Sequence, residues 1–108
     1  MNTETLVKQL CDINAPVGNE NLAAEKIKSF FGPLCDKAYI DRFFNVIGYK
    51  KGTSSDPRKI IITAHYDQIG MIVSGYEKGG FLRISNLGGV DTKALLASEV
   101  IVHGREEV

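Results

Sequence analysis

Apolar side chains in the first third of the chain repeat at helical spacing. One face carries Leu6, Val7, Leu10 and Cys11, which predicts a helix over residues 4–13. A second apolar stripe predicts a helix with Asn19 as its N-cap and its end at Gly32-Pro33; the stripe comprises Leu22, Ala23, Ile27, Phe30 and Phe31. Between them, residues 14–19 predict a loop, because Pro16 disfavours helical backbone at the residue before it.

After residue 36 the apolar pattern shortens to that of β-strands. Segments rich in β-branched or aromatic residues, bounded by Gly, Pro, Asp or Ser, predict strands at residues 37–41, 46–50, 59–64, 70–76, 81–85 and 100–104. The run Ile60-Ile61-Ile62 does not alternate with polar residues. Such a run is typical of a strand buried on both faces, so we expect it to be the central strand of a covered sheet. Residues 76–81 predict a hairpin turn between partly exposed strands, and the fold class is α/β.

Composition narrows the function classes. The 108 residues include 13 basic and 13 acidic side chains, so the formal net charge is zero. Proteins bind nucleic acids and anionic lipids through clustered Lys and Arg side chains. This chain has no such cluster, so we expect neither partner. No apolar run approaches the length of a membrane span, and the first residues lack the pattern of a signal peptide. We therefore expect a cytoplasmic protein.

The two cysteines do not predict a disulfide framework or a zinc knuckle. Cys11 and Cys35 stand 24 residues apart, without a CxxC pair or a histidine at metal-binding spacing. Free cysteine is usually a small buried side chain in proteins. We expect both to be buried.

Candidate chemistry lies at the end of the predicted central strand. His65 and Asp67 are two residues apart, so an extended backbone projects both side chains to the same face. An imidazole can bind a divalent metal, and a neighbouring carboxylate can bind the metal or orient the imidazole. The alternative is a structural histidine at a strand end beside an aspartate that caps a turn. The spacing alone leaves both interpretations open.

Four segments in order resemble one protein family. Residues 64–70, Ala-His-Tyr-Asp-Gln-Ile-Gly, resemble the AHxDxIG signature of the forty-second family of metallopeptidases, which includes the tetrahedral and glutamyl aminopeptidases. Residues 10–20 resemble that family's opening helix and loop, residues 41–48 its D-x-x-G-N strand, and residues 81–91 its GFLR…LGGVD segment. Phe44 stands where the family has a glycine before the asparagine.

The resemblance implies a fold and an activity. Residues 1–69 would begin a mixed-sheet dinuclear zinc-peptidase catalytic domain, and residues 70–108 would supply the first strands of an inserted, small β-barrel-like domain used in dimerisation or assembly. The chain would be the N-terminal fragment of a cytoplasmic aminopeptidase. Such an enzyme removes N-terminal residues from peptide substrates with two divalent metal ions, Zn or Co, and works as a homo-oligomer.

The resemblance also implies roles for two residues. His65 would ligate one of the two metals, and Asp67 would be the catalytic-site aspartate that orients or tunes that ligand. The family's other ligands and its glutamate base lie beyond position 108. We therefore expect at most one weak metal site in this chain, and no activity from the chain alone.

Two further functions come from different classes. A scaffold or assembly module would use the antiparallel strands from Gly70 onward, because open strand edges can pair with another chain. A glucanase would need two carboxylates flanking a sugar, whereas Asp67 is the one acid in a plausible site. The glucanase hypothesis is therefore the weakest.

Overall fold

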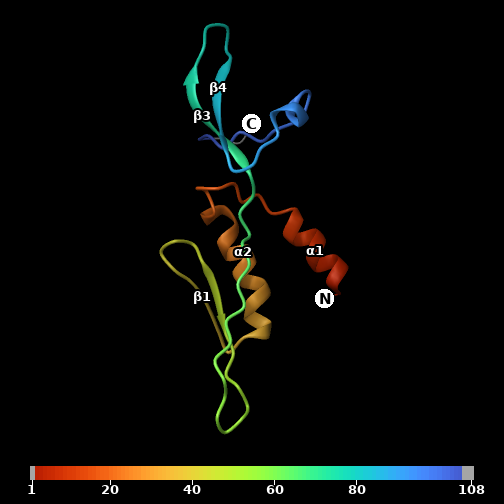
Figure 1. The fold of residues 1–108 in the computed structure, drawn as a ribbon, viewed down its shortest axis with the longest axis vertical. Helices are drawn as coiled ribbons and strands as arrows, with labels where there is room; N and C mark the ends of the chain where they lie inside the picture. The colour runs from red at the N-terminus through yellow and green to blue at the C-terminus, as the bar shows by residue number, and fades with distance from the viewer. Residues whose placement is uncertain (1, 106–108) are drawn as a thin grey trace.

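The computed structural model describes residues 2–105 and begins with two helices (Figure 1). Helix α1 spans Thr3–Cys11, and the Asn2 side chain caps it by accepting an amide N–H of the first turn at 2.8 Å. Helix α2 spans Asn21–Phe31 and continues into a short 3-10 turn, η1, at Gly32–Leu34. Both helices lie where the apolar periodicity predicts them.

Helix α2 packs against a two-stranded antiparallel sheet. Strand β1 (Lys37–Ile40) pairs with β2 (Val46–Tyr49). The turn between them is organised by Asp41, whose carboxylate accepts the backbone N–H groups of Phe43 and Asn45 at 2.8 and 2.9 Å. The Asn45 side-chain amide donates to the same carboxylate at 2.8 Å. The Asp41 carboxylate therefore accepts three hydrogen bonds within the turn.

A second antiparallel hairpin forms a separate sheet. Strand β3 (Gly70–Tyr76) pairs with β4 (Leu82–Leu87), and a 3-10 turn, η2 (Thr92–Leu95), follows. Gly79 and Gly80 both adopt φ of +86°, a conformation that strongly favours glycine in a turn. The predicted hairpin is confirmed. A domain boundary at residue 69 remains a prediction.

The core is small for a chain of this length. Its buried side chains belong to Ala15, Ala23, Ala24 and Ile27. The chain is elongated, with a radius of gyration of 18.2 Å, whereas a compact domain of this size has about 13 Å. Its accessible area is 9451 Å², against about 5,900 Å² for a typical folded protein of this mass. Much apolar surface therefore remains uncovered.

The predicted central strand is not formed. The trace after the lowest loop in Figure 1 leads up to β3, and within it Ile60, Ile61 and Ile62 are 80%, 86% and 93% exposed. A strand of this composition needs neighbours on both edges and a covering layer on each face. The described part of the chain supplies neither, so the expectation of a buried strand at residues 59–64 is wrong here.

Two other expectations are also wrong. Residues 100–102 lie outside any strand, and His103 lies in an isolated bridge; a strand requires a continuous ladder of paired residues. Cys11 is exposed and Cys35 is half-buried, because the small core does not extend to these positions. Among residues 2–105, no helix is long and apolar enough to cross a membrane.

Candidate functional site

His65 and Asp67 lie on residues 59–67, the site segment. The loop before α2 holds the C-terminal end of this segment. The Gln68 backbone N–H donates to the Ala15 carbonyl at 2.7 Å, and the Val17 N–H donates to the Gln68 carbonyl at 3.1 Å. These bonds make a short parallel bridge between Pro16 and Gln68. Ala15 belongs to the buried core, so the bridge connects the site segment to the best-packed part of the molecule.

The structure brings the two predicted site residues together. The His65 Nδ1 atom lies 3.2 Å from Asp67 Oδ1 and 3.1 Å from the Asp67 backbone carbonyl oxygen. The His65 side chain is 84% exposed and that of Asp67 is 38% exposed. The expected same-face arrangement is therefore present, on the outside of the molecule.

This geometry favours one tautomer of the imidazole. Both groups near His65 Nδ1 are oxygen atoms that accept hydrogen bonds, so the proton belongs on Nδ1, which donates it to them. The Nε2 lone pair is then available to a ligand. Metal-binding histidines commonly show this pattern, in which a carboxylate or carbonyl accepts from the second ring nitrogen and orients the ring.

His65 can supply one ligand of a metal centre, but the described residues do not supply a complete set of ligands. A catalytic zinc site uses three protein ligands and keeps one open position. Within residues 2–105, no group of three or more His, Cys, Asp or Glu side chains is arranged to hold a metal ion. His65 is thus a possible single ligand, and Asp67 is placed to orient it.

A surface hollow of about 240 Å³ lies beside the imidazole. The lining includes His65, Tyr66 and Gln68. The other lining residues come from the two helices and the loop between them and are mainly apolar: Leu10, Cys11, Ile13 and Ile27. A ligand on His65 would therefore stand next to a mainly apolar surface.

Sequence reasoning missed the role of Tyr66. Its hydroxyl donates to the Phe44 carbonyl at 2.6 Å, and its ring packs against the core cluster of Ala15, Ala23 and Ile27. Burial raises the pKa of the Tyr66 hydroxyl, and the carboxylates of Glu20, Asp41 and Asp67 raise it further. No spacing signal in the sequence indicates this contact, because the two residues are 22 positions apart.

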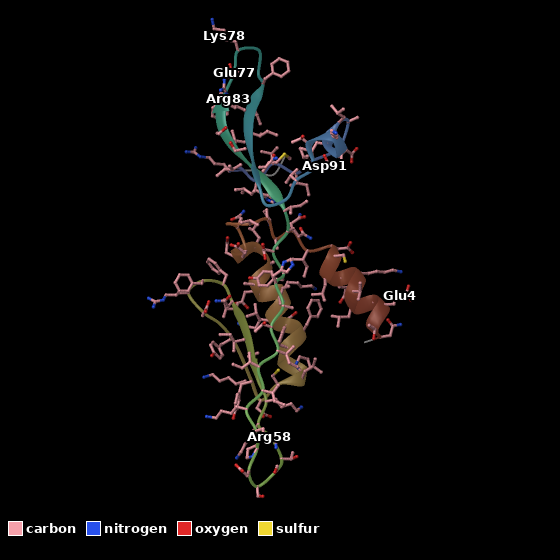
Figure 2. All side chains as sticks on the ribbon, in the orientation of Figure 1. Glu4, Arg58, Glu77, Lys78, Arg83 and Asp91 are labelled. Atoms are coloured by element: carbon pink, nitrogen blue, oxygen red, sulfur yellow. The ribbon has the colours of Figure 1, made fainter. Side chains whose placement is uncertain are left out.

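Other charged side chains make structural contacts. Figure 2 labels Glu77 and Arg83 on the second hairpin, where the two form an ion pair. The labelled Asp91 accepts the Lys93 backbone N–H at 3.0 Å and so caps η2. These contacts stabilise turns and leave the His65–Asp67 pair as the candidate site.

Comparison with solved structures defines the class of protein. The chain resembles the aminopeptidase APDkam598 from the archaeon Desulfurococcus kamchatkensis, with a TM-score of 0.76 and 38% sequence identity. The match covers 84% of this chain and 25% of that one. The mixed helix and strand arrangement thus resembles part of an aminopeptidase structure.

Sequence comparisons identify the family. The model of the M42 glutamyl aminopeptidase family matches residues 45–108, more than half of the chain. A lysyl aminopeptidase of Pyrococcus furiosus is 30% identical over 96 residues, or 88% of this chain, and a putative aminopeptidase of Acetivibrio thermocellus is 36% identical over 85 residues, or 79%. The chain belongs to the M42 glutamyl aminopeptidase family, as its motifs predict, and it spans about a quarter of these relatives' length, 27% and 25%.

Proposed function

We propose that this chain is the N-terminal part of a cytoplasmic, metal-dependent aminopeptidase. In this proposal His65 Nε2 binds one of two divalent metal ions, zinc or cobalt, and Asp67 orients the imidazole. The observation that carries it is the pair of oxygen acceptors on His65 Nδ1, at 3.1 and 3.2 Å.

Three features support the view that the chain belongs to a larger catalytic unit. Its aminopeptidase relatives are about four times as long, since it spans 25–27% of them. Ile60, Ile61 and Ile62 form an exposed run suited to a covered sheet. The accessible area also far exceeds that of a typical folded domain. Residues 1–69 would start the catalytic domain, and residues 70–108 would start the inserted assembly domain of a homo-oligomer.

The chemistry assigned to these residues is limited. A divalent metal, when bound, polarises a carbonyl and lowers the pKa of a bound water in hydrolases of this kind. His65 would hold the metal in place, and Asp67 would keep the Nδ1 proton directed away from it. The substrate would be a peptide, cleaved after its N-terminal residue. General-base and bridging groups would come from outside residues 2–105, so the chain alone is expected to be inactive.

Zinc titration of the 108-residue chain, followed by NMR of the imidazole resonances, tests the site. We expect His65 to respond and His65→Ala to abolish the response. His103→Ala is the matched control because it removes the second of the two histidines. Binding that survives His65→Ala, or that follows His103, would refute the site assignment.

A second candidate function is an assembly module without catalysis. Within residues 2–105 each sheet has two strands, and the exposed isoleucine run offers further strand-forming surface. Sedimentation velocity over a range of concentrations separates the two proposals. An ordered oligomer that does not respond to zinc would favour the assembly role, whereas a strict monomer would remove its support.

A further inference from the structure

Phe44 occupies a backbone conformation that disfavours its side chain. Its φ is +63°, in the left-handed region, where a bulky residue is a clear outlier. The conformation is required by the Asp41 turn, in which the Phe44 N–H donates to the Asp41 carbonyl at 3.1 Å. A residue held in this way needs compensating contacts from its surroundings.

Tyr66 supplies such a contact. Its hydroxyl donates to the Phe44 carbonyl at 2.6 Å, and a longer approach of 3.5 Å reaches the Glu20 carbonyl. A phenol has one proton to donate, so the shorter contact to Phe44 is the principal bond. The Tyr66 ring is partly buried against the core, while its bond to the Phe44 carbonyl lies at the exposed surface.

The same tyrosine stands between the two candidate site residues. His65 and Asp67 contact each other on the exposed side of the segment, while Tyr66 packs inward against the core. Among the described residues, the Tyr66 hydroxyl makes the hydrogen bond that ties residues 59–67 to the rest of the fold, and the next such connection is the Gln68 bridge to Ala15. The site segment is thus held on both sides of Asp67.

We propose that Tyr66 is a positioning residue: its bond to the Phe44 carbonyl clamps the backbone between residues 65 and 68, and this clamp sets the directions of the His65 and Asp67 side chains. The same bond stabilises the strained turn at Phe44, so the turn and the site segment order each other. The significance of His65 and Asp67 rests on the proposed function. The clamp itself consists of protein groups alone.

Amide hydrogen exchange in the 108-residue chain tests the clamp without metal or substrate. In Tyr66→Phe we expect the amides of Asn45 and Gln68 to exchange about three- to tenfold faster, the range for loss of one hydrogen bond. The χ1 couplings of His65 and Asp67 should shift toward rotameric averaging. Amides of the β3–β4 hairpin should be unchanged, and Tyr76→Phe is the control because Tyr76 is 84% exposed.

A rescue experiment separates the clamp from general packing. Phe44→Gly removes the strain of the left-handed residue, so adding it to Tyr66→Phe should return Asn45 exchange to within twofold of the original rate. The averaging of the His65 χ1 coupling should persist, because the clamp is still missing.

Either of two results would overturn the proposal. In the first, Asn45 and Gln68 exchange and the His65 coupling are unchanged in Tyr66→Phe. In the second, exchange accelerates uniformly or amide dispersion collapses, which shows a general structural role. If Tyr66→Phe has the expected effects on exchange and coupling but the original chain does not bind zinc, the result counts against the proposed function alone.

Discussion

The His65 imidazole and the Asp67 carboxylate form a local pair, with Nδ1 and Oδ1 3.2 Å apart. Both residues lie on one short segment, so their separation depends mainly on local backbone conformation. The carboxylate accepts from Nδ1 and leaves the Nε2 lone pair for a ligand, which is the arrangement expected of an oriented metal ligand.

Replacing the carboxylate should weaken metal binding without removing the ligand. For Asp67→Ala we expect zinc affinity at His65 to fall about 10- to 100-fold, the usual effect of losing an orienting partner. NMR titration of the His65 resonances measures the affinity. Asp56→Ala, in the polar loop, is the control and should leave it unchanged. An affinity within twofold of the original for Asp67→Ala would contradict the orienting role.

A side chain at Gly48 should force the neighbouring side chains to move. A Cβ at this position would lie 2.6 Å from Cys35 Sγ and would also overlap the Phe31 ring. Gly48→Ala is therefore expected to lower the free energy of unfolding by about 1–3 kcal/mol through overpacking between α2 and β2. Urea unfolding followed by circular dichroism measures this change.

Gly32→Ala is the matched control for that experiment. A Cβ at Gly32 would meet nothing within 4 Å, and the residue has helical backbone angles. It should leave stability unchanged or raise it slightly. Equal effects of the two substitutions would show that close packing at Gly48 is not responsible.

Acid should loosen the Asp41 turn. The side-chain hydrogen bond from Asn45 is the largest influence lowering the pKa of Asp41, and backbone N–H groups and Arg42 also favour the charged form. The charged Asp41 carboxylate thus stabilises the folded state in full above the ordinary carboxyl pKa of about 3.9. This stabilisation is lost as the pH falls through the lower pKa of the folded state.

NMR resonances of the Asn45 backbone and side-chain amides should report this transition between pH 5 and about pH 2. Asp41→Asn should abolish the transition, because its amide does not titrate in this range. A midpoint at or above the ordinary carboxyl value would contradict the lowered pKa.

A charge in the isoleucine run should reduce self-association. Ile61 is 86% exposed within a β-branched segment, and exposed segments of this kind pair with other chains. We expect Ile61→Lys to shift sedimentation of concentrated samples toward the monomer. Tyr76→Lys, at an equally exposed position (84%) in β3, should have a smaller effect. Equal effects would point to net charge as the cause.

The chain by itself should not hydrolyse aminoacyl-p-nitroanilides, with or without added zinc or cobalt. The reason is that its described residues contain no group of three metal ligands, and two-metal hydrolysis needs bridging and general-base groups. Release of p-nitroaniline measures turnover. Robust activity that disappears in His65→Ala would refute the expectation that further ligands are essential.

The sequence by itself determined the features that depend on neighbouring residues. Both helices follow from apolar periodicity, the β3–β4 hairpin follows from Gly79 and Gly80, and the proximity of His65 to Asp67 follows from their two-residue spacing. The quoted motifs likewise predict the family that the comparisons identify. Each of these depends on interactions within a few residues, or on residue identity alone.

Only the tertiary structure decided which side chains are buried and which distant segments contact each other. It leaves Ile60–Ile62 exposed, because a buried strand requires neighbouring strands that residues 2–105 do not provide. It also brings Tyr66 to Phe44 across 22 residues, a contact that depends on how α2, the first hairpin and the site segment pack. Local patterns carry no information on such distances, so burial and long-range hydrogen bonds became known only from the folded chain.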